Sequence, residues 1–377
     1  MISDEQAAEA VALLREHGTI AAAHRASGLN WHTLHRRLVR AAERGLDGAV
    51  PEPIARGRRI KGVSTLYDRN GNVAAQWVKD TAEPRVAEDV AEAFRDAFRE
   101  WRGHARPRPA PAGCAADLLT VYPVVDHHHG LYAWGAETGA SYDVATSAAL
   151  LHSAMESLIA RAPPSAEAVL LILGDFCHAD DSTARTPASG HALDVDTRHS
   201  KVLRSGVEML VRATSMLASK HERVTVRVLP GNHDPHAALA VSVALEMFFA
   251  REPRVTVDPS PSLWWFKRWG RVLLGATHGH NIKPGDMPAA MAAAVPEWWG
   301  ATVRRRVYFG HYHGRAIWQG RGATAEGFEA MTARDAYAAG CGFFSDRAMH
   351  AITHDRTTCR ETRVVEALDV LDLEALK

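Results

Sequence analysis

The sequence predicts an α/β protein in which sheets are covered by helices. Five short apolar runs rich in Val, Leu and Ile are typical of buried strands, and they occupy residues 118–125, 168–173, 224–229, 272–276 and 307–309. Longer segments with apolar residues three and four positions apart alternate with them, at 142–162, 197–221 and 235–251. This alternation predicts helices packed on the outer faces of the sheets.

The first 50 residues predict a small helix-turn-helix domain. Its three helices are expected at 5–17, 20–26 and 31 to about 44. Asn30 is placed as the N-cap of the third helix. If the domain binds DNA or RNA, Arg36, Arg37 and Arg40 on this helix would contact phosphates. A helical trio of this kind would equally serve as a docking or oligomerisation module.

Residues 51–105 predict a β-hairpin followed by an amphipathic helix. Asn70-Gly71 between two strand-like runs is a strong hairpin signal. From Pro84 onward apolar residues recur every four positions, as in a helix with one apolar face. The Pro-rich stretch 106–113 is the predicted linker, and residues 114–377 form the main domain.

Composition narrows the class of protein. The chain of 377 residues has a formal net charge of zero, and no stretch approaches 18 uninterrupted apolar residues. The N-terminus lacks the features of a signal peptide, so we expect a soluble, cytoplasmic protein that does not contact membranes. The four cysteines show no paired spacing and are expected to be free thiols, and Cys177 is assigned a structural role. Oligomeric state cannot be predicted from these features.

Polar motifs rich in His and Asp follow the five predicted strands. They are Asp126-His127-His128, Gly174-Asp175, Gly231-Asn232-His233-Asp234, His278 and Gly310-His311-Tyr312-His313. Ligands bind beyond the carboxyl ends of strands in α/β sheets, and the glycines are expected to let the backbone turn sharply there. Imidazole, carboxylate and amide groups together suit divalent metals, and two ions about 3.5–4 Å apart are an effective centre for hydrolysing phosphoesters.

The order of these motifs resembles that of the calcineurin-like metallophosphoesterases, over residues 118–355. The resemblance implies a two-sheet α/β/β/α sandwich with two divalent ions, manganese being the first candidate and iron, zinc or a mixed pair the alternatives. It assigns one metal to Asp126, His128, Asp175 and His313. It assigns the other to Asp175, Asn232, His278 and His311, so that Asp175 bridges the two.

The same resemblance makes His233 the general acid, which protonates the leaving oxygen while a metal-bound hydroxide attacks phosphorus. Asp234 is then expected to orient His233. With its added helix-turn-helix, the chain is similar to phage and prophage members of the superfamily. It is more distantly similar to DNA-repair exonucleases. We expect their large cap domain to be absent here, because about 64 residues follow His313 and most of them are needed to finish the sheets.

Other residues near the motifs are candidates for lesser roles. His178, Arg185 and His280 are candidates for substrate contact. His127 and His129 are expected to point away from His128, toward solvent or into a supporting position. The segment 284–300, which contains Trp298 and Trp299, is interpreted as a lid over the site or as a surface that packs on the N-terminal module.

The leading functional hypothesis is a phosphodiesterase acting on nucleic acid, with DNA or RNA contacted through residues 1–80. The alternative is a phosphatase or phosphodiesterase of a small molecule, cyclic nucleotide or phosphoprotein, with the N-terminal helices as a docking module. A third reading is a DNA-binding regulator with a structural metal site. A basic groove leading to His233 would favour nucleic acid, and a closed pocket lined by Trp298 and Trp299 would favour a small ligand.

Overall fold

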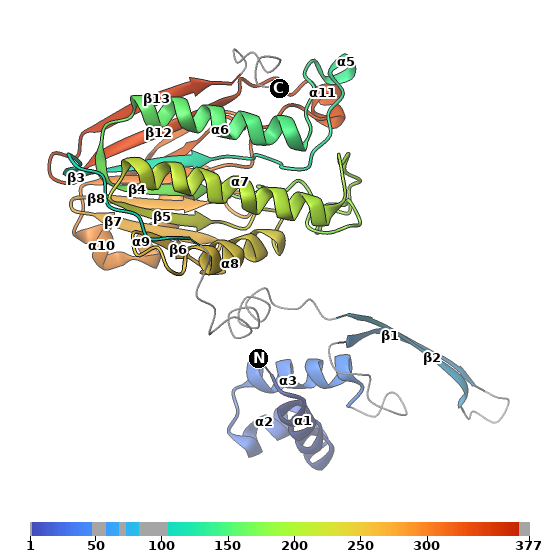
Figure 1. The fold of residues 1–377 in the computed structure, drawn as a ribbon. Coiled ribbons are helices and arrows are strands. Elements are labelled where there is room, and N and C mark those ends of the chain that lie inside the picture. The colour runs from blue at the N-terminus through green and yellow to red at the C-terminus, as the bar shows by residue number, and fades with distance from the viewer. Residues whose placement is uncertain (1, 47–57, 68–72, 83–104, 369–377) are drawn as a thin grey trace. The chain divides into compact units, whose positions relative to one another are not determined.

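The computed structural model describes residues 2–46, 58–67, 73–82 and 105–368 (Figure 1). The chain divides into two compact units, Met1–Val86 and Ala87–Lys377. The predicted hairpin turn at Asn70-Gly71 and the predicted amphipathic helix at 84–104 lie outside the described residues.

The first unit contains three helices, α1 (Asp4–His17), α2 (Ile20–Ser27) and α3 (Trp31–Arg44). Each begins at a side-chain N-cap and ends at a glycine in the left-handed conformation, which explains why their bounds could be read closely from the sequence. Small apolar residues such as Ala7, Ala23 and Leu34 are fully buried between the helices. The unit also contains β1 (Arg58–Tyr67) and β2 (Val73–Ala82), which pair antiparallel.

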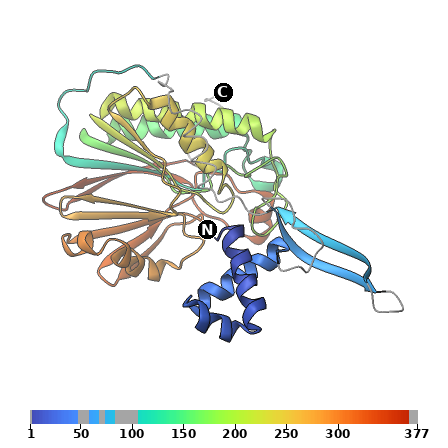
Figure 2. The same ribbon diagram turned by 90° about the horizontal axis from the view of Figure 1, so that it is seen from below.

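The second unit contains two sheets that pack face to face (Figure 2). The strands of the first sheet are β3 (Ala115–Val124), β4 (Ser165–Ile172), β5 (Arg223–Val228), β6 (Val255–Asp258), β12 (Ala348–Asp355) and β13 (Glu361–Ala367). The strands of the second are β7 (Trp264–Trp269), β8 (Val272–Thr277), β9 (Arg304–Phe309), β10 (Ala316–Gly320) and β11 (Ala323–Gly327).

The spatial order is β13-β12-β3-β4-β5-β6 in the first sheet and β10-β11-β9-β8-β7 in the second. Strands β3 to β6 run parallel, as do β8, β9 and β11, whereas the remaining pairings are antiparallel. The parallel strands in each sheet therefore end together at one edge, which is where ligands of α/β sheets are expected.

Helices cover the outer faces of both sheets. They are α6 (Val144–Arg161), α7 (His199–Lys220) and α8 (Ala237–Phe249) on the first sheet, and α9 (Met287–Ala294) and α10 (Pro296–Gly300) on the second (Figures 1 and 2). Short helices α5 (Gly135–Thr138) and α11 (Ala336–Cys341) lie in loops. The α/β class is confirmed, with layers in the order helix, sheet, sheet, helix.

The apolar strands have two buried faces, as parallel strands covered by helices require. In β4, Val169 and Leu171 enter the core between the sheets, whereas Leu170 and Ile172 pack against the helices. This alternation follows from the two-residue period of a strand.

The segment 284–300, one interpretation of which is a lid over the site, packs on the second sheet. Met287 and Met291 are fully buried against the second sheet, and Trp299 packs with them. The segment is therefore an outer layer of that sheet.

The predicted linker, 106–113, lies within the second unit and is hydrogen-bonded there. The backbone N–H of Ala105 donates to the carbonyl of Phe248 at 2.9 Å, and that of Arg108 donates to the Glu252 carboxylate at 2.9 Å. Among the described helices, none combines the length and the apolar character needed to cross a membrane.

Candidate metal centre

The candidate ligands lie in the loops directly after five strands. Asp126 and His128 follow β3, Asp175 follows β4 and Asn232 follows β5, whereas His278 follows β8, and His311 and His313 follow β9. The first three strands belong to one sheet and the other two to its partner. Donors from both sheets therefore meet at their shared edge, as the sequence pattern indicates.

The backbone is strained at these positions. Five of the candidate ligands have positive φ angles, namely Asp126 (43°), His128 (47°), Asp175 (48°), His311 (71°) and His313 (55°). A non-glycine residue in this conformation costs about 1–3 kcal/mol and is typical of functional sites. The fold thus holds these side chains in an orientation that an ordinary loop would not adopt.

The three motif glycines act in two different ways. Gly174 has a φ of 90° and fits the expected sharp turn. Gly231 and Gly310 do not have positive φ; instead a Cβ at 231 would lie 2.0 Å from Asp175 Oδ1, and one at 310 would lie 3.0 Å from Asp126 Oδ2. At these two positions the backbone bends just after the glycine without a positive φ, and glycine permits close approach of a carboxylate.

One group of donors contains Asp126, His128 and His313, whose ligand atoms all lie within 4.8 Å of one another. The Nε2 atoms of His128 and His313 are 3.2 Å apart. Asp126 is buried, and among the described residues neither of its carboxylate oxygens has a hydrogen-bond partner. Burial raises the pKa of Asp126. His278 Nδ1 lies 3.7 Å from Asp126 Oδ1. A buried carboxylate without hydrogen bonds is costly, and a divalent cation at this group would offset that cost.

The second group contains Asp175, His278 and His311, again within 4.8 Å of one another. His278 Nδ1 lies 2.8 Å from the carbonyl oxygen of Leu173 and donates to it, which leaves Nε2 to face the site. This Nε2 atom lies 3.2 Å from Asp175 Oδ2 and 2.9 Å from Asn232 Oδ1. Two ligands bound at right angles, each about 2.1 Å from one ion, lie about 3.0 Å apart. The spacing of the second group therefore fits a metal ion.

Asp175 lies between the two groups. Its Oδ2 is 4.0 Å from His128 Nε2 in the first group, and its Oδ1 accepts the backbone N–H of His233 at 2.8 Å. Although burial opposes it, the charge of His278 holds the pKa of Asp175 well below its usual value. Burial likewise opposes protonation of His278, but Asp175 and Asp126 raise its pKa to about 9. These shifts show a site that concentrates negative charge on Asp175.

His233 and Asp234 are arranged differently from the sequence expectation. The Asp234 carboxylate accepts the backbone N–H groups of Asp175, Cys177 and Gly231 at 3.1, 2.9 and 3.0 Å. His233 Nδ1 instead lies 2.9 Å from the carbonyl oxygen of His178. The expectation that Asp234 orients His233 is wrong, because the carboxylate is occupied by joining the two metal-binding loops.

The three candidates for substrate contact, His178, His280 and Arg185, lie in different places. His178 is buried beside the centre, with Nδ1 3.1 Å from His128 Nδ1, and its ring stacks on that of His233. His280 lies beside His278, and burial lowers its pKa to about 4. Arg185 is exposed and donates to the carbonyl oxygen of Gly190 within its own loop, so it is not brought to the cavity at the centre.

His127 and His129 are buried and do not face solvent. His129 bonds to Ser147 on α6 and to Ser205 on α7, and both rings stack on Phe176. His127 and His129 therefore support the loop after β3. The alternative that they face solvent is wrong, and the alternative that they have a supporting position is confirmed. Cys177 is also buried, and burial raises its pKa, which fits a structural thiol.

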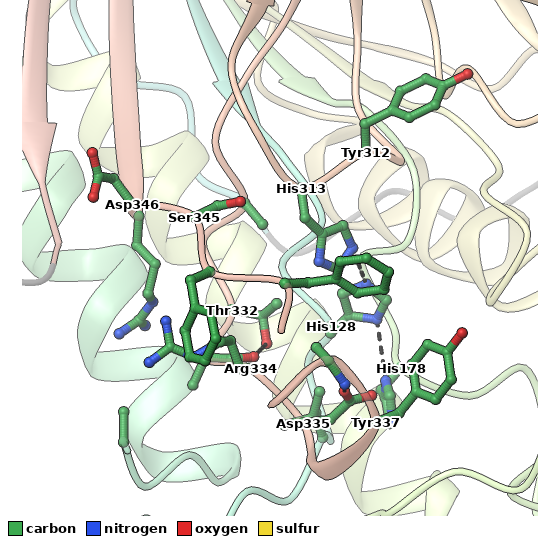
Figure 3. Close-up of a pocket in the computed structure, with 18 of the residues that line it drawn as sticks. His128, His178, Tyr312, His313, Thr332, Arg334, Asp335, Tyr337, Ser345 and Asp346 are labelled. Atoms are coloured by element: carbon green, nitrogen blue, oxygen red, sulfur yellow. Dashed lines mark hydrogen bonds between the residues drawn. The ribbon is translucent and has the colours of Figure 1, made fainter. Parts of the chain in front are cut away.

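A cavity of about 640 Å³ opens onto the donor groups (Figure 3). His128, His178, His233, His311 and His313 line one part of it. The opposite part comes from α11 and the loop after it, together with Arg334, none of which was identified from the sequence. The available signal was the Phe343-Phe344 pair in a segment rich in Gly and Asp. Trp298 and Trp299 do not line this cavity.

The three arginines proposed for nucleic-acid contact belong to α3 in the first unit. Arg36 is exposed. Arg37 donates to Glu9 on α1 at 2.9 Å, and Arg40 lies 4.0 Å from the Asp4 carboxylate. Two of the three are thus engaged within the helical trio, and Arg36 remains open to a partner.

Comparisons with known proteins give only distant similarities to solved structures. No family model and no curated protein matches the chain. A predicted phosphoesterase from Streptococcus pneumoniae is 10% identical, with a TM-score of 0.31 over 68% of this chain and 92% of that one. An archaeal phosphodiesterase is 11% identical, with a TM-score of 0.32 over 66% and 99% of the two chains.

A 5'-nucleotidase from Candida albicans is 9% identical, with a TM-score of 0.33 over 71% of this chain and 55% of that one. Scores of this size say nothing about the details of the site. Any function must therefore be inferred from the residues of the site themselves.

Proposed function

We propose that the chain is a dinuclear-metal phosphoesterase that hydrolyses phosphodiester bonds, with nucleic acid as the leading substrate class. The observation that supports it is the pair of donor groups beside a cavity, with Asp175 Oδ2 3.2 Å from His278 Nε2 in its own group and 4.0 Å from His128 Nε2 in the other. Asp126, His128, Asp175 and His313 would hold one ion, and Asp175, Asn232, His278 and His311 the other. Two divalent ions there would neutralise phosphate charge and lower the pKa of a bound water.

The metal is proposed to be manganese, with iron, zinc or a mixed pair as alternatives. Each donor group combines imidazole nitrogen with carboxylate oxygen, which suits all of these ions. Two features support a resident cation over a structural histidine cluster. The Asp126 carboxylate accepts no hydrogen bond among the described residues, and the Nδ1–H of His278 donates to Leu173, which directs Nε2 into the site.

His233 is proposed as the general acid. Its Nδ1–H donates to the carbonyl oxygen of His178, so the ring presents Nε2 as its second nitrogen, and the side chain lines the cavity. The imidazolium can then transfer its Nε2 proton to the leaving oxygen of a phosphoester.

The first unit is proposed to contact DNA or RNA through exposed residues at the start of α3. Trp31, His32, His35 and Arg36 are exposed there, where a recognition helix carries its base and phosphate contacts. The second candidate function is hydrolysis of a small phosphoester, cyclic nucleotide or phosphoprotein, with the helices as a docking module. The cavity volume of about 640 Å³ lies in the range of small-molecule sites. This volume supports hydrolysis of a small phosphoester as well as hydrolysis of nucleic acid.

The test is a panel of phosphoesters assayed with Mn²⁺, Fe²⁺ and Zn²⁺, in the intact chain and in His233→Ala. The variant should keep its metal and lose about 10²–10⁴-fold in turnover on substrates with alkyl leaving groups. The loss should be much smaller on p-nitrophenyl esters, whose leaving group needs no proton. Because His233 also lies within 4.8 Å of His128 and His178, loss of a metal ion in the variant would instead make His233 a ligand.

A further inference from the structure

The cavity beside the metal centre has a wall of exposed aromatic rings. Tyr337 lies on α11, and Phe343 and Phe344 lie in the loop that follows it. Their exposed fractions are 71%, 59% and 70%. Aromatic side chains usually bury most of their surface, so three such rings within eight residues point to a ligand that covers them. We call these three residues the aromatic wall.

The aromatic wall stands on an ordered support. Asp335 caps α11 by accepting the N–H of Ala338 at 2.7 Å, and Gly342 ends the helix with a φ of 74°. The N–H of Phe343 then donates to the carbonyl oxygen of Ala338 at 3.0 Å. The rings of Tyr337 and Phe343 consequently lie with their centroids 6.4 Å apart. The backbone therefore presents the rings in a defined arrangement before any ligand binds.

A positive charge accompanies the aromatic wall. The Arg334 guanidinium lies 4.7 Å from the centre of the Phe344 ring. Its Nε is buried, and among the described residues it has no hydrogen-bond partner. Figure 3 shows Arg334 on the same side of the cavity as Asp346, away from Tyr312. Arg334 Nη2 lies 3.5 Å from the carbonyl oxygen of Thr138, and the residue lines the cavity. A guanidinium on an aromatic face suits a ligand that carries both a flat ring and acceptor oxygens.

We propose that the aromatic wall stacks the nucleobase of a nucleoside phosphate whose phosphoester lies at the metal centre, and that Arg334 contacts its acceptor oxygens. This inference rests on the proposed function. One cavity is lined both by His233 and His313 and by the aromatic wall, and its volume suffices for a nucleotide. Stacking accepts every base because every base has a π face. A phosphoserine or an alkyl phosphate would leave the rings uncovered.

The test compares two substrates with the same leaving group. Thymidine 5'-(p-nitrophenyl phosphate) carries a base, whereas methyl p-nitrophenyl phosphate carries none. The double variant Tyr337→Ala with Phe344→Ala should lower kcat/KM for the thymidine ester about 5- to 100-fold and leave that for the methyl ester within about twofold. Phe344→Leu, which keeps apolar volume but removes the π face, should show a smaller loss on the thymidine ester alone. Trp298→Ala is the matched control, since this exposed aromatic lies outside the cavity, and it should change neither value.

A binding measurement separates this inference from the proposed function. Calorimetry would compare thymidine 5'-monophosphate with deoxyribose 5-phosphate on the Mn²⁺-treated intact chain and the double variant. The aromatic wall predicts tighter binding of the base-bearing ligand, and loss of that advantage in the variant. A chain that hydrolyses no phosphoester but keeps this difference would refute the hydrolase and retain the base-binding site. Adding oligothymidylate distinguishes a strand end from a free nucleotide as the source of the base.

Two results would overturn the inference. One is an equal fall in kcat/KM for the thymidine and methyl esters in the double variant, which would mean that the aromatic wall supports the metal centre. The other is equal affinity of the intact chain for the two monophosphates, which would mean that the rings recognise no base.

Discussion

Replacing Asp234 with alanine should lower the free energy of unfolding, because its side chain has a structural role. The Asp234 carboxylate is buried and accepts three backbone N–H groups at 2.9 to 3.1 Å, from the loops that carry Asp175 and Gly231. A buried donor left without a partner costs about 1–3 kcal/mol. Because water can enter the space vacated by the side chain, we expect a loss of about 3–5 kcal/mol in the free energy of unfolding, near the top of the range for single substitutions. In a unit of about 290 residues, Ala87–Lys377, that corresponds to about 5–8 °C in Tm.

The assay is urea unfolding of the intact chain, with metal content measured on the same samples. Asp234→Asn retains one oxygen acceptor and should lose about half as much stability. Asp286→Ala is the control, since its exposed ion pair with Arg321 should contribute less than about 0.5 kcal/mol. The assignment of Asp234 to a structural role is refuted if the free energy of unfolding of Asp234→Ala lies within about 1 kcal/mol of that of the original chain while turnover is lost. Asp234 would then act on His233.

Three further outcomes are expected. Gly231→Ala should lower metal occupancy, because the new Cβ would lie 2.0 Å from Asp175 Oδ1; unchanged metal content by mass spectrometry would contradict this. Burial lowers the pKa of His221 to about 4. As the pH falls, His221 is therefore protonated in the unfolded chain before it is protonated in the folded one. The free energy of unfolding should fall by up to about 3 kcal/mol between pH 6.5 and 4, as measured from urea midpoints. His221→Gln should show a shallower acid loss, and an unchanged slope would count against it. Arg36→Ala should weaken DNA binding and flatten its salt dependence in a filter-binding assay, while Arg37→Ala, already paired with Glu9, should do so less; equal effects would place the interface elsewhere.

Much of the second unit could be predicted because its strands are unambiguous. The runs that became β4 and β8 are buried on both faces, so their sequences are continuously apolar. Each is followed at once by a polar ligand, and a parallel topology brings such ends together. For this reason the convergence of Asp175 and His278 was accessible from the sequence.

Other features depend on contacts that no local pattern encodes. The carboxylate of Asp234 turns to three backbone N–H groups, one of them 59 residues away along the chain at Asp175. The burial of His127 and His129 depends on α6 and α7, which supply Ser147 and Ser205. In both cases tertiary packing decides which of several hydrogen-bonding options a side chain takes.

The aromatic wall escaped prediction for a different reason. Tyr337 lies on a helix of six residues, Ala336–Cys341, that is too short to give a periodic signal, and Phe343 and Phe344 lie in the loop after it. Of the later strands, β10 and β11 have five residues each and β13 is half-exposed, so they give weak sequence signals.

The central claim is that one carboxylate serves two metal ions, and metal stoichiometry tests it most directly. The intact chain, loaded with Mn²⁺ and freed of excess ion, should hold two ions by mass spectrometry. Asp126→Asn should hold one, because only the first donor group contains this residue, whereas Asp175→Asn should lose both. An intact chain with a single ion, or an Asp175→Asn variant that keeps two, would contradict the account.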